Sequence, residues 1–248
     1  KKIDLIGEVV LIDKYMTLET EKLFYNLNSN IAYYHSFGNI IEKGKIINSK
    51  KGEYHSNIHK FFLKDSVTIT TKQYNIITDN MQYNTNSETA FFLGPSYIIS
   101  KNKTIYCENG WYNTKTNISQ FQDNAYITTK GYILKADSIY YDKNLGYGKA
   151  INNVTIIDTI KNIIVYGELG EYFEEKEIME ISETPLLQIL LEEDTLFMHA
   201  DRFISQQKKE EKRILAYNNV KFFQTNLQGK CDSLSYNLSD SIIEMFNQ

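Results

Sequence analysis

Cysteine, proline, glycine and tryptophan are all scarce in this sequence. Its 248 residues include 2 cysteines, 2 prolines, 12 glycines and 1 tryptophan. Two cysteines are too few for a disulfide framework, and Cys107 and Cys231 are too far apart in the sequence for a paired-cysteine metal site. The low proline content, together with 42% hydrophobic residues, argues against a disordered chain. We therefore expect a folded protein without a disulfide framework.

An excess of positive charge and long apolar runs are missing as well. The 27 lysines and arginines face 31 aspartates and glutamates, so the formal charge is −4 and no cationic surplus neutralises phosphates. The longest apolar stretches, such as residues 186–191, are far shorter than the roughly 20 residues that a membrane span needs. We therefore expect neither nucleic-acid binding nor a transmembrane segment. The first residues lack the features of a signal peptide, and the abrupt start at Lys1 leaves room for a leader before it.

Tyrosine, in contrast, is abundant and regularly spaced. Of the 19 tyrosines, five follow one another at intervals of 29 residues, and the series continues at intervals of 31, 33 and 31 residues. The column consists of Tyr25, Tyr54, Tyr83, Tyr112, Tyr141, Tyr172, Ser205 and Tyr236. A nearly constant interval of this length is typical of repeat proteins, in which each unit buries its apolar face against its neighbours. We therefore predict eight repeats.

Further columns accompany the tyrosine. The residue seven positions earlier is apolar in seven of the eight repeats, the residue five earlier is small in all eight, and the residue four earlier is acidic in seven, with Lys50 as the exception. The residue after the tyrosine is often Asn or Asp, which favours a turn. A second turn, built from small polar residues, is predicted at residues 38–40, 65–67, 94–96, 123–125, 152–154 and 218–220.

The segments between these turns predict β-strands. They are rich in β-branched and aromatic residues, with apolar residues at alternate positions. At about 3.3 Å per residue, a 29-residue repeat holds two strands of roughly ten residues and two turns. Helical spacing of leucines occurs only within residues 185–197, and the repeat columns continue through this segment, so we favour strands there too. The predicted fold class is all-β.

Positions seven and five before the tyrosine point to the same side of a strand, because alternate side chains share a face. This places a row of branched apolar residues beside a row of small ones. Two interpretations follow: a trough for a long apolar ligand, or an ordinary core in which the small residues let two sheets pack closely. Cys107 and Cys231 both occupy the small position, four repeats and roughly 19 Å or more apart, so we predict two buried thiols without a bridge.

The repeated motif resembles a known family. Acid, apolar residue and tyrosine recur with fixed spacing in residues 78–84 (TDNMQYN), 136–142 (ADSIYYD) and 231–237 (CDSLSYN). Together with the small polar corners, they make the chain similar to the OstA/LptA family of lipopolysaccharide-transport proteins, and most of all to the OstA-like proteins of Bacteroidetes-type bacteria. The similarity extends over essentially the whole chain and is most regular over residues 7–160.

The resemblance implies an elongated open β-jellyroll (β-taco) of stacked antiparallel strands, built from about eight 29-residue repeats. It also implies one repeat domain over residues 1–248, cut from a longer array. In the family, acyl chains of lipopolysaccharide lie in the apolar interior. Carried over to this sequence, the lipid-facing positions are Leu18, Thr20, Ile47, Ser49, Ile76, Thr78, Ile105, Cys107, Leu134, Ala136, Val165 and Met198.

The resemblance further implies a non-enzymatic protein of the periplasm, associated with the outer-membrane lipopolysaccharide-transport machinery. Its expected partners are lipopolysaccharide, through lipid A, and other proteins of the OstA/LptA fold. Those proteins, or further copies of this chain, would join end to end by strand addition. We predict no cofactor.

Motifs for catalysis are missing from the sequence: it has no Gly-x-Ser-x-Gly, His-Glu-x-x-His or P-loop pattern. His55 and His59 are not expected to bind a metal, and we predict no catalytic and no metal-binding residues. The acidic column is interpreted as a solvated row at bends, the alternatives being calcium ligands or the acid pair of a glycosidase. Two alternative proteins stay open: a parallel, extracellular β-solenoid that binds or cleaves polysaccharide, and a structural spacer.

Overall fold

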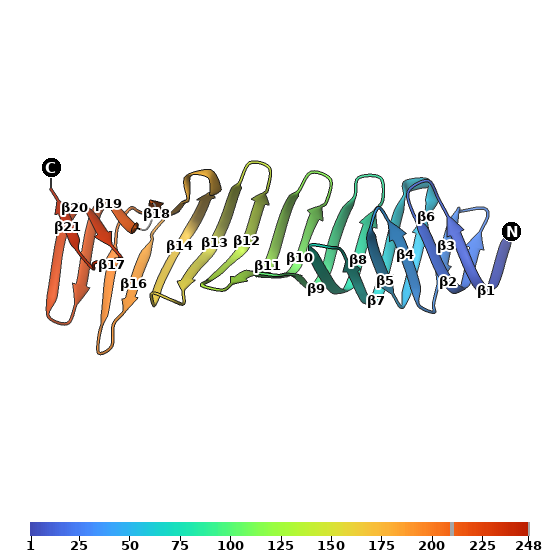
Figure 1. Ribbon diagram of the computed structural model, residues 1–248, viewed down its shortest axis with the longest axis horizontal. Helices are drawn as coiled ribbons and strands as arrows, with labels where there is room; N and C mark the ends of the chain where they lie inside the picture. The colour runs from blue at the N-terminus through green and yellow to red at the C-terminus, as the bar shows by residue number, and fades with distance from the viewer. Residues whose placement is uncertain (209–210, 248) are drawn as a thin grey trace. The chain divides into compact units, whose positions relative to one another are not determined.

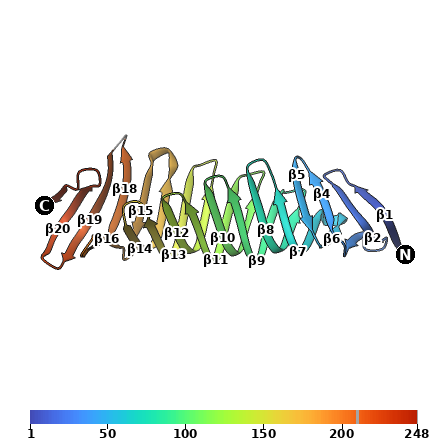
Figure 2. The ribbon, with the colours of Figure 1, turned by 60° about the horizontal axis from the view of Figure 1, so that its bottom comes forward.

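The protein consists of β-strands throughout the residues that the structure describes. This computed structural model describes residues 1–208 and 211–247, which contain 21 strands and two 3₁₀ turns. Contacts between Cα atoms divide the chain into two compact units, Lys1–Asp123 and Asn124–Gln248. Figures 1 and 2 show successive strands of each unit arranged as hairpins along the chain. The predicted all-β fold class is confirmed. Within the described part, no helix is long and apolar enough to cross a membrane.

Unit 1 contains ten complete strands. They are β1 (Lys2–Ile12), β2 (Thr17–Asn26), β3 (Ile31–Tyr34), β4 (Gly38–Glu42), β5 (Lys45–Ser49), β6 (Lys51–His55), β7 (Lys60–Thr70), β8 (Tyr74–Asn84), β9 (Thr89–Ser100) and β10 (Lys103–Asn113). The 3₁₀ turn η1 (Ser56–Ile58) joins β6 to β7, and β11 (Ile118–Thr129) contains the border between the two units.

Unit 2 continues with ten further strands in its described residues. They are β12 (Tyr132–Asp142), β13 (Tyr147–Asp158), β14 (Ile163–Phe173), β15 (Ile178–Ser182), β16 (Leu186–Leu190), β17 (Thr195–His199), β18 (Arg202–Lys208), β19 (Glu211–Gln224), β20 (Leu227–Asn237) and β21 (Ile243–Phe246). The turn η2 (Glu174–Lys176) joins β14 to β15. The segment with helical leucine spacing forms β16 and β17, as the repeat columns predict.

The strands pair antiparallel in both units. In unit 1, β7 pairs with β8 and β8 with β9, and in unit 2, β12 pairs with β13 and β13 with β14, all antiparallel. The alternative of a parallel β-solenoid is therefore wrong. Parallel neighbours need long crossover connections, whereas the turns between these long strands have only two to four residues.

The long strands bend at a corner made by two consecutive residues in the left-handed conformation. Asp65 and Ser66 have φ angles of 63° and 56°, and Asn152 and Asn153 have φ angles of 59° and 51°. Further pairs of this kind are Asp123-Asn124, Glu183-Thr184 and Asn218-Asn219. Asn and Asp tolerate this conformation better than other residues with a Cβ, which explains why the corner column favours them. The first predicted corner is displaced, because Gly38 begins β4 and the bend lies in residues 35–37.

The acidic column lies opposite these corners. The register between β13 and β14 shifts from Ile151↔Leu169 to Val154↔Gly167, so two corner residues face the single residue Glu168. The Glu168 carboxylate accepts a hydrogen bond of 3.0 Å from the backbone N–H of Asn153. Asp137 accepts one of 2.9 Å from the Asn153 side chain, and Asp201 accepts one of 3.0 Å from that of Asn219. The interpretation of the acids as a row at bends is confirmed for these residues.

The residue after the tyrosine starts the hairpin turn, as predicted. The side-chain oxygens of Asn84, Asn113 and Asp142 each accept hydrogen bonds from two backbone N–H groups within the next three residues. Where this position is His55 or Phe173 instead, the connection contains a 3₁₀ turn, η1 or η2. The two cysteines are buried free thiols, and burial raises the pKa of Cys107 to about 12.

The corner conformation makes a prediction about stability. Replacing Asn152, exposed and at φ 59°, with valine should destabilise unit 2 by about 1–2 kcal/mol, because a β-branched side chain is strained in the left-handed region. Urea unfolding measures the change. Asn152→Gly is the matched control and should be within about 0.5 kcal/mol of the parent. Equal stability of the two variants would contradict a left-handed corner.

Candidate lipid-binding interior

Each bent strand contributes one half to each of two walls. In unit 1, the first wall contains the strand halves on one side of the corners. These halves end at the turns that follow Ile12, Glu42, Thr70 and Ser100. The first wall includes the positions seven and five before the tyrosine. The second wall contains the halves between the corners and the hairpins that begin after the tyrosine. Hydrogen bonds between turns of the first wall and tyrosines of the second show that the walls face each other.

The predicted apolar row forms a continuous cross-strand ladder in the first wall of unit 1. Its members are paired in the order Leu11, Leu18, Ile40, Ile47, Ile69, Ile76, Ile98 and Ile105. From Leu18 onward every member is buried. The predicted residues Leu18, Ile47, Ile76 and Ile105 therefore lie in one row, and alternate with apolar residues from the strands between them.

The predicted residues of unit 2 form a second ladder that is less completely buried. It runs through Leu134, Ile156, Val165, Leu187, Met198, Phe222 and Gly229. Leu134 and Val165 are half-buried, whereas Met198 is buried. The Phe222 ring occupies the place of a side chain at Gly229, where an added Cβ would meet it at 2.4 Å. This explains why the last repeat has glycine in an otherwise apolar column.

The small column lies at the corner, and its hydroxyls bond to the backbone there. Thr20 Oγ1 is 3.0 Å from the carbonyl oxygens of both Ser36 and Phe37, and Ser49 Oγ donates to the Lys51 carbonyl at 3.0 Å. Thr78 Oγ1 donates to the Asn80 carbonyl at 3.3 Å. These three residues, together with Cys107 and Ala136, are buried. A small side chain is thus required where the backbone turns.

The interior of unit 1 is filled by its own side chains. The largest completely buried ones are aromatic: Tyr34, Tyr54, Phe61, Tyr83 and Phe92. Tyr34 lies over Gly38 and Gly52, where an added Cβ would approach its ring to within 2.3–2.5 Å. Its hydroxyl is 2.6 Å from Ser49 Oγ, and burial raises its pKa to about 12. Of the two interpretations of the small column, the structure shows close packing rather than an open trough, because aromatic rings occupy the space.

The tyrosine column links the two walls of unit 1 at their outer ends. The Tyr54 hydroxyl donates to Asp13, and the Tyr83 hydroxyl donates to Glu42. In both pairs the acid lies 41 residues before the tyrosine. Asp13 directly follows β1 and Glu42 is the last residue of β4, so both lie at turns of the first wall. We call this line of contacts, opposite the corners, the mouth. Burial raises the pKa of Glu42, and burial and the Glu42 charge raise the pKa of Tyr83.

A cluster of charged side chains reinforces the mouth of unit 1. The mouth cluster consists of Glu42, Lys43, Lys45, Tyr83, Glu88 and Thr114. Lys43 Nζ lies 2.5 Å from Glu88 Oε1, and Lys45 Nζ lies 3.0 Å from Glu88 Oε2. Lys45 also donates to Tyr83 and Thr114 at 3.1 and 2.8 Å. Burial would raise the pKa of Glu88, but hydrogen bonds from Lys43 and Lys45 outweigh it and lower the pKa to about 2.

Unit 2 has a related contact between its walls. Lys212, near the start of β19, donates to Asp158 Oδ2 at 2.8 Å and to the Tyr132 hydroxyl. Asp158 follows the same 29-residue spacing as Asp13 and Glu42, five and four repeats later. Sequence reasoning found Tyr54 and Tyr83 as members of the tyrosine column but missed their partners at the mouth. A search for acids at the turn before each repeat, 41 residues ahead of a tyrosine, would have found Asp13 and Glu42.

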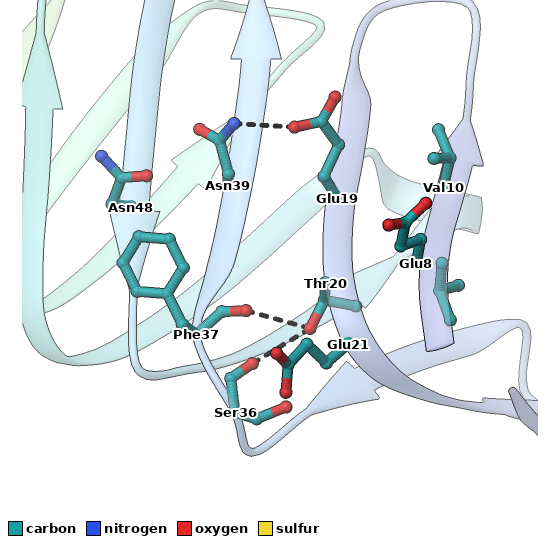
Figure 3. A pocket seen from close by; sticks show the side chains of 10 residues that line it. Glu8, Val10, Glu19, Thr20, Glu21, Ser36, Phe37, Asn39 and Asn48 are labelled. Carbon is teal, nitrogen blue, oxygen red and sulfur yellow. Dashed lines mark hydrogen bonds between the residues drawn. The ribbon is translucent and has the colours of Figure 1, made fainter. Parts of the chain in front are cut away.

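A surface pocket of about 810 Å³ lies on the outward side of the first wall in unit 1 (Figure 3). Figure 3 shows the carboxylates of Glu8, Glu19 and Glu21 around it, with the ring of Phe37 at one side. Asn39 donates to Glu19 at 2.9 Å. Three carboxylates make this pocket unsuitable for an acyl chain. Among the described residues, no three His, Cys, Asp or Glu side chains are placed to hold a metal ion.

Comparisons with known proteins identify a family and a similar solved structure. A family model described as OstA-like protein matches residues 1–79 and 75–137, which together cover 137 of the 248 residues. Among solved structures, the chain is similar to LptH of Pseudomonas aeruginosa, the LptA homologous periplasmic component of its lipopolysaccharide transport device, with 9% identity and a TM-score of 0.28. That match covers 59% of this chain and 82% of LptH. No curated protein matches the chain.

The apolar ladder predicts a large difference between two neighbouring residues. Ile76→Ala should destabilise unit 1 by about 2–5 kcal/mol, because it leaves a cavity at a side chain that is only 1% exposed. Ile77→Ala, at a side chain 47% exposed on the opposite face, should cost less than about 1 kcal/mol. Denaturant unfolding of both variants measures the difference. Similar losses would contradict the assignment of the inward face.

The mouth cluster predicts a pH-dependent stability. Since the folded pKa of Glu88 is lowered from 4.5 to about 2, its ion pairs stabilise the fold above pH 4.5 and lose this effect as the pH falls towards 2. Glu88→Gln should therefore cost about 1–2 kcal/mol at pH 7 and almost nothing near pH 2. Burial is the largest cause of the raised pKa of Glu42, ahead of the Glu88 charge, so the contribution of Glu42 to the pH dependence should be similar in the two proteins.

Thermal unfolding of the parent and the Glu88→Gln variant from pH 2 to 7 measures this dependence. Asp65→Asn is the matched control, because Asp65 pairs with Lys51 at 2.6 Å where both side chains are about half exposed. Its cost should be smaller than that of Glu88→Gln, because solvent screens an exposed pair. A Glu88→Gln effect that does not change with pH would contradict the ion-pair role of Glu88.

Proposed function

The chain belongs to the OstA-like protein family, and we propose on that basis that it is a non-enzymatic protein of lipopolysaccharide transport. Its interior shields the acyl chains of lipid A on their way across the periplasm to the outer membrane. The family match agrees with the resemblance found in the repeat motifs. Both units belong, in this proposal, to one repeat domain.

The observation that carries the proposal is the uninterrupted apolar ladder of unit 1. Seven strand steps of about 4.8 Å separate Leu11 from Ile105, which makes the ladder about 34 Å long. This exceeds the hydrocarbon thickness of a bilayer, about 30 Å, which two opposed layers of acyl chains fill. An acyl chain lying along the ladder would therefore have apolar contacts over its whole length.

Loading requires the two walls to separate, since aromatic side chains fill the interior of unit 1. Apolar side chains that an acyl chain covers remain shielded from water, so most of the hydrophobic stabilisation is retained. Separation of the walls breaks the polar interactions of the mouth, and ion pairs and hydrogen bonds of this type contribute only about 1 kcal/mol each. The mouth is thus the line along which opening costs least.

Partners are proposed at the terminal strands. In unit 1, β1 is paired with β2 and has strongly exposed side chains at Ile6 and Ile12. In unit 2, β21 is paired with β20 and has exposed Met245 and Phe246. Strand addition at such edges would join proteins of the same fold, including further copies of this chain, end to end. The polysaccharide alternative loses its support, because it required parallel coils.

Site-specific photo-crosslinking in cells tests the proposal. A photoreactive residue at Ile76 or Ile105 should capture lipopolysaccharide, because both side chains lie in the buried ladder. The matched control is Ile77, next to Ile76 but on the outward face, where little or no capture is expected. Capture only at outward positions such as Ile77 or Lys115 would contradict lipid binding in the interior.

A further inference from the structure

Three hydrogen-bond donors of the mouth cluster converge on one carboxylate. Lys43 Nζ and Lys45 Nζ lie 2.5 and 3.0 Å from the two carboxylate oxygens of Glu88. Thr114 Oγ1 lies 3.4 Å from Glu88 Oε2 and 3.2 Å from the Glu88 carbonyl oxygen. The lysines belong to the hairpin between β4 and β5, and Thr114 follows β10. Because these donors come from both walls, they form an anion-binding site with Glu88 as its present occupant.

Glu88 reaches this site from the tip of the hairpin between β8 and β9. It lies in residues 85–88, outside the strands, and has a left-handed φ of 54°. Side chains at the end of such a turn are free to reorient without disturbing a strand. Lys43 is largely exposed, with 59% of its side chain accessible, whereas 12% of the Lys45 side chain is accessible. The site is therefore open to solvent on one side and closed on the other.

The closed side adjoins the apolar interior. Lys45 is 3.1 Å from the hydroxyl of Tyr83, whose side chain is completely buried, and 3.9 Å from Glu42, which is also buried. An amphiphile whose chains lie in the interior has its polar head at the mouth. The position of the two lysines thus matches the place where the head group of such a molecule would emerge.

Resting on the function proposed above, we propose that Lys43, Lys45 and Thr114 bind a phosphate monoester of the lipid head group, and that Glu88 occupies this site when the interior is empty. A phosphate monoester has about −1.5 to −2 charges and three acceptor oxygens, so it satisfies three converging donors better than a carboxylate does. The nearby acid, Glu42, opposes a second negative charge.

Binding measurements with two forms of one lipid test this site. The dissociation constant is measured for lipid A with its phosphates and for the same lipid after enzymatic dephosphorylation. Glu88→Gln removes the competing charge, so it should bind the phosphorylated lipid roughly three- to tenfold more tightly than the parent. Because the variant also loses ion pairs between the walls, its affinity for the dephosphorylated lipid should rise as well, but by a clearly smaller factor.

Lys43→Gln tests the site by removing one of its donors. It should weaken binding of the phosphorylated lipid several-fold. Binding of the dephosphorylated lipid should not weaken, because the ion pair that the variant loses opposes opening of the mouth. Lys51→Gln is the matched control, because it removes the same charge from an exposed lysine at a corner, where it pairs with Asp65. Equal effects of the two lysine variants, or an equal effect of Glu88→Gln on both lipids, would overturn the proposal.

Inorganic phosphate distinguishes a head-group site from a site for free phosphate. Phosphate at millimolar concentration should compete only weakly with the phosphorylated lipid, since the acyl chains supply most of the affinity. Competition at micromolar concentration would show a free-phosphate site and overturn the head-group assignment.

If neither lipid binds to any variant, the proposed transport function fails. In that case the dissociation constant of inorganic phosphate tests the site. Phosphate should bind the Glu88→Gln variant more tightly than the parent protein, and equal binding would overturn the proposed site.

Discussion

The two-residue left-handed corner is the constraint on which the rest of this structure depends. At the corners between β7 and β8 and between β13 and β14, two residues face one, so the strand bends and its two halves enter different walls. The acid opposite the corner satisfies backbone or side-chain donors there, and the small residue before the acid leaves room for the turn. Without the corner, the apolar ladder and the tyrosine column would lie in one flat sheet with a face exposed to water.

Because the strands bend, the apolar contacts lie between the two walls and the polar contacts lie at the mouth. Side chains between the walls of unit 1 are apolar or aromatic and buried, whereas the contacts at the mouth are hydrogen bonds and ion pairs. Hydrophobic burial does not depend on a particular partner atom, but the mouth contacts depend on geometry. In the proposed function, a lipid chain therefore replaces the partners of the interior, and the mouth is the part that opens. This division is the physical basis of the proposed transport role.

Much of the fold was predictable from the sequence, because the repeat aligns residues with equivalent environments. The row through Leu18, Ile47, Ile76 and Ile105 and the turns after the tyrosines were found in this way. The mouth cluster was not, since Glu42 and Tyr83 lie in different columns and meet only when the walls face each other. The sequence left a trough and a filled core both open for a related reason. The space beside Ser49 of the small column is occupied by Tyr34 from the other wall, which no column in the sequence assigns to it.

Native mass spectrometry of gently purified protein tests the central claim most directly, because it separates a lipid carrier from a structural spacer with the same fold. A carrier whose walls open along the mouth should retain lipid, so the spectrum should show a second species heavier than the chain by the mass of one lipopolysaccharide or lipid A molecule. Collisional activation should release that mass intact. A spectrum with the bare chain alone, also after incubation with lipid A, would contradict the account and favour a spacer with a permanently filled interior.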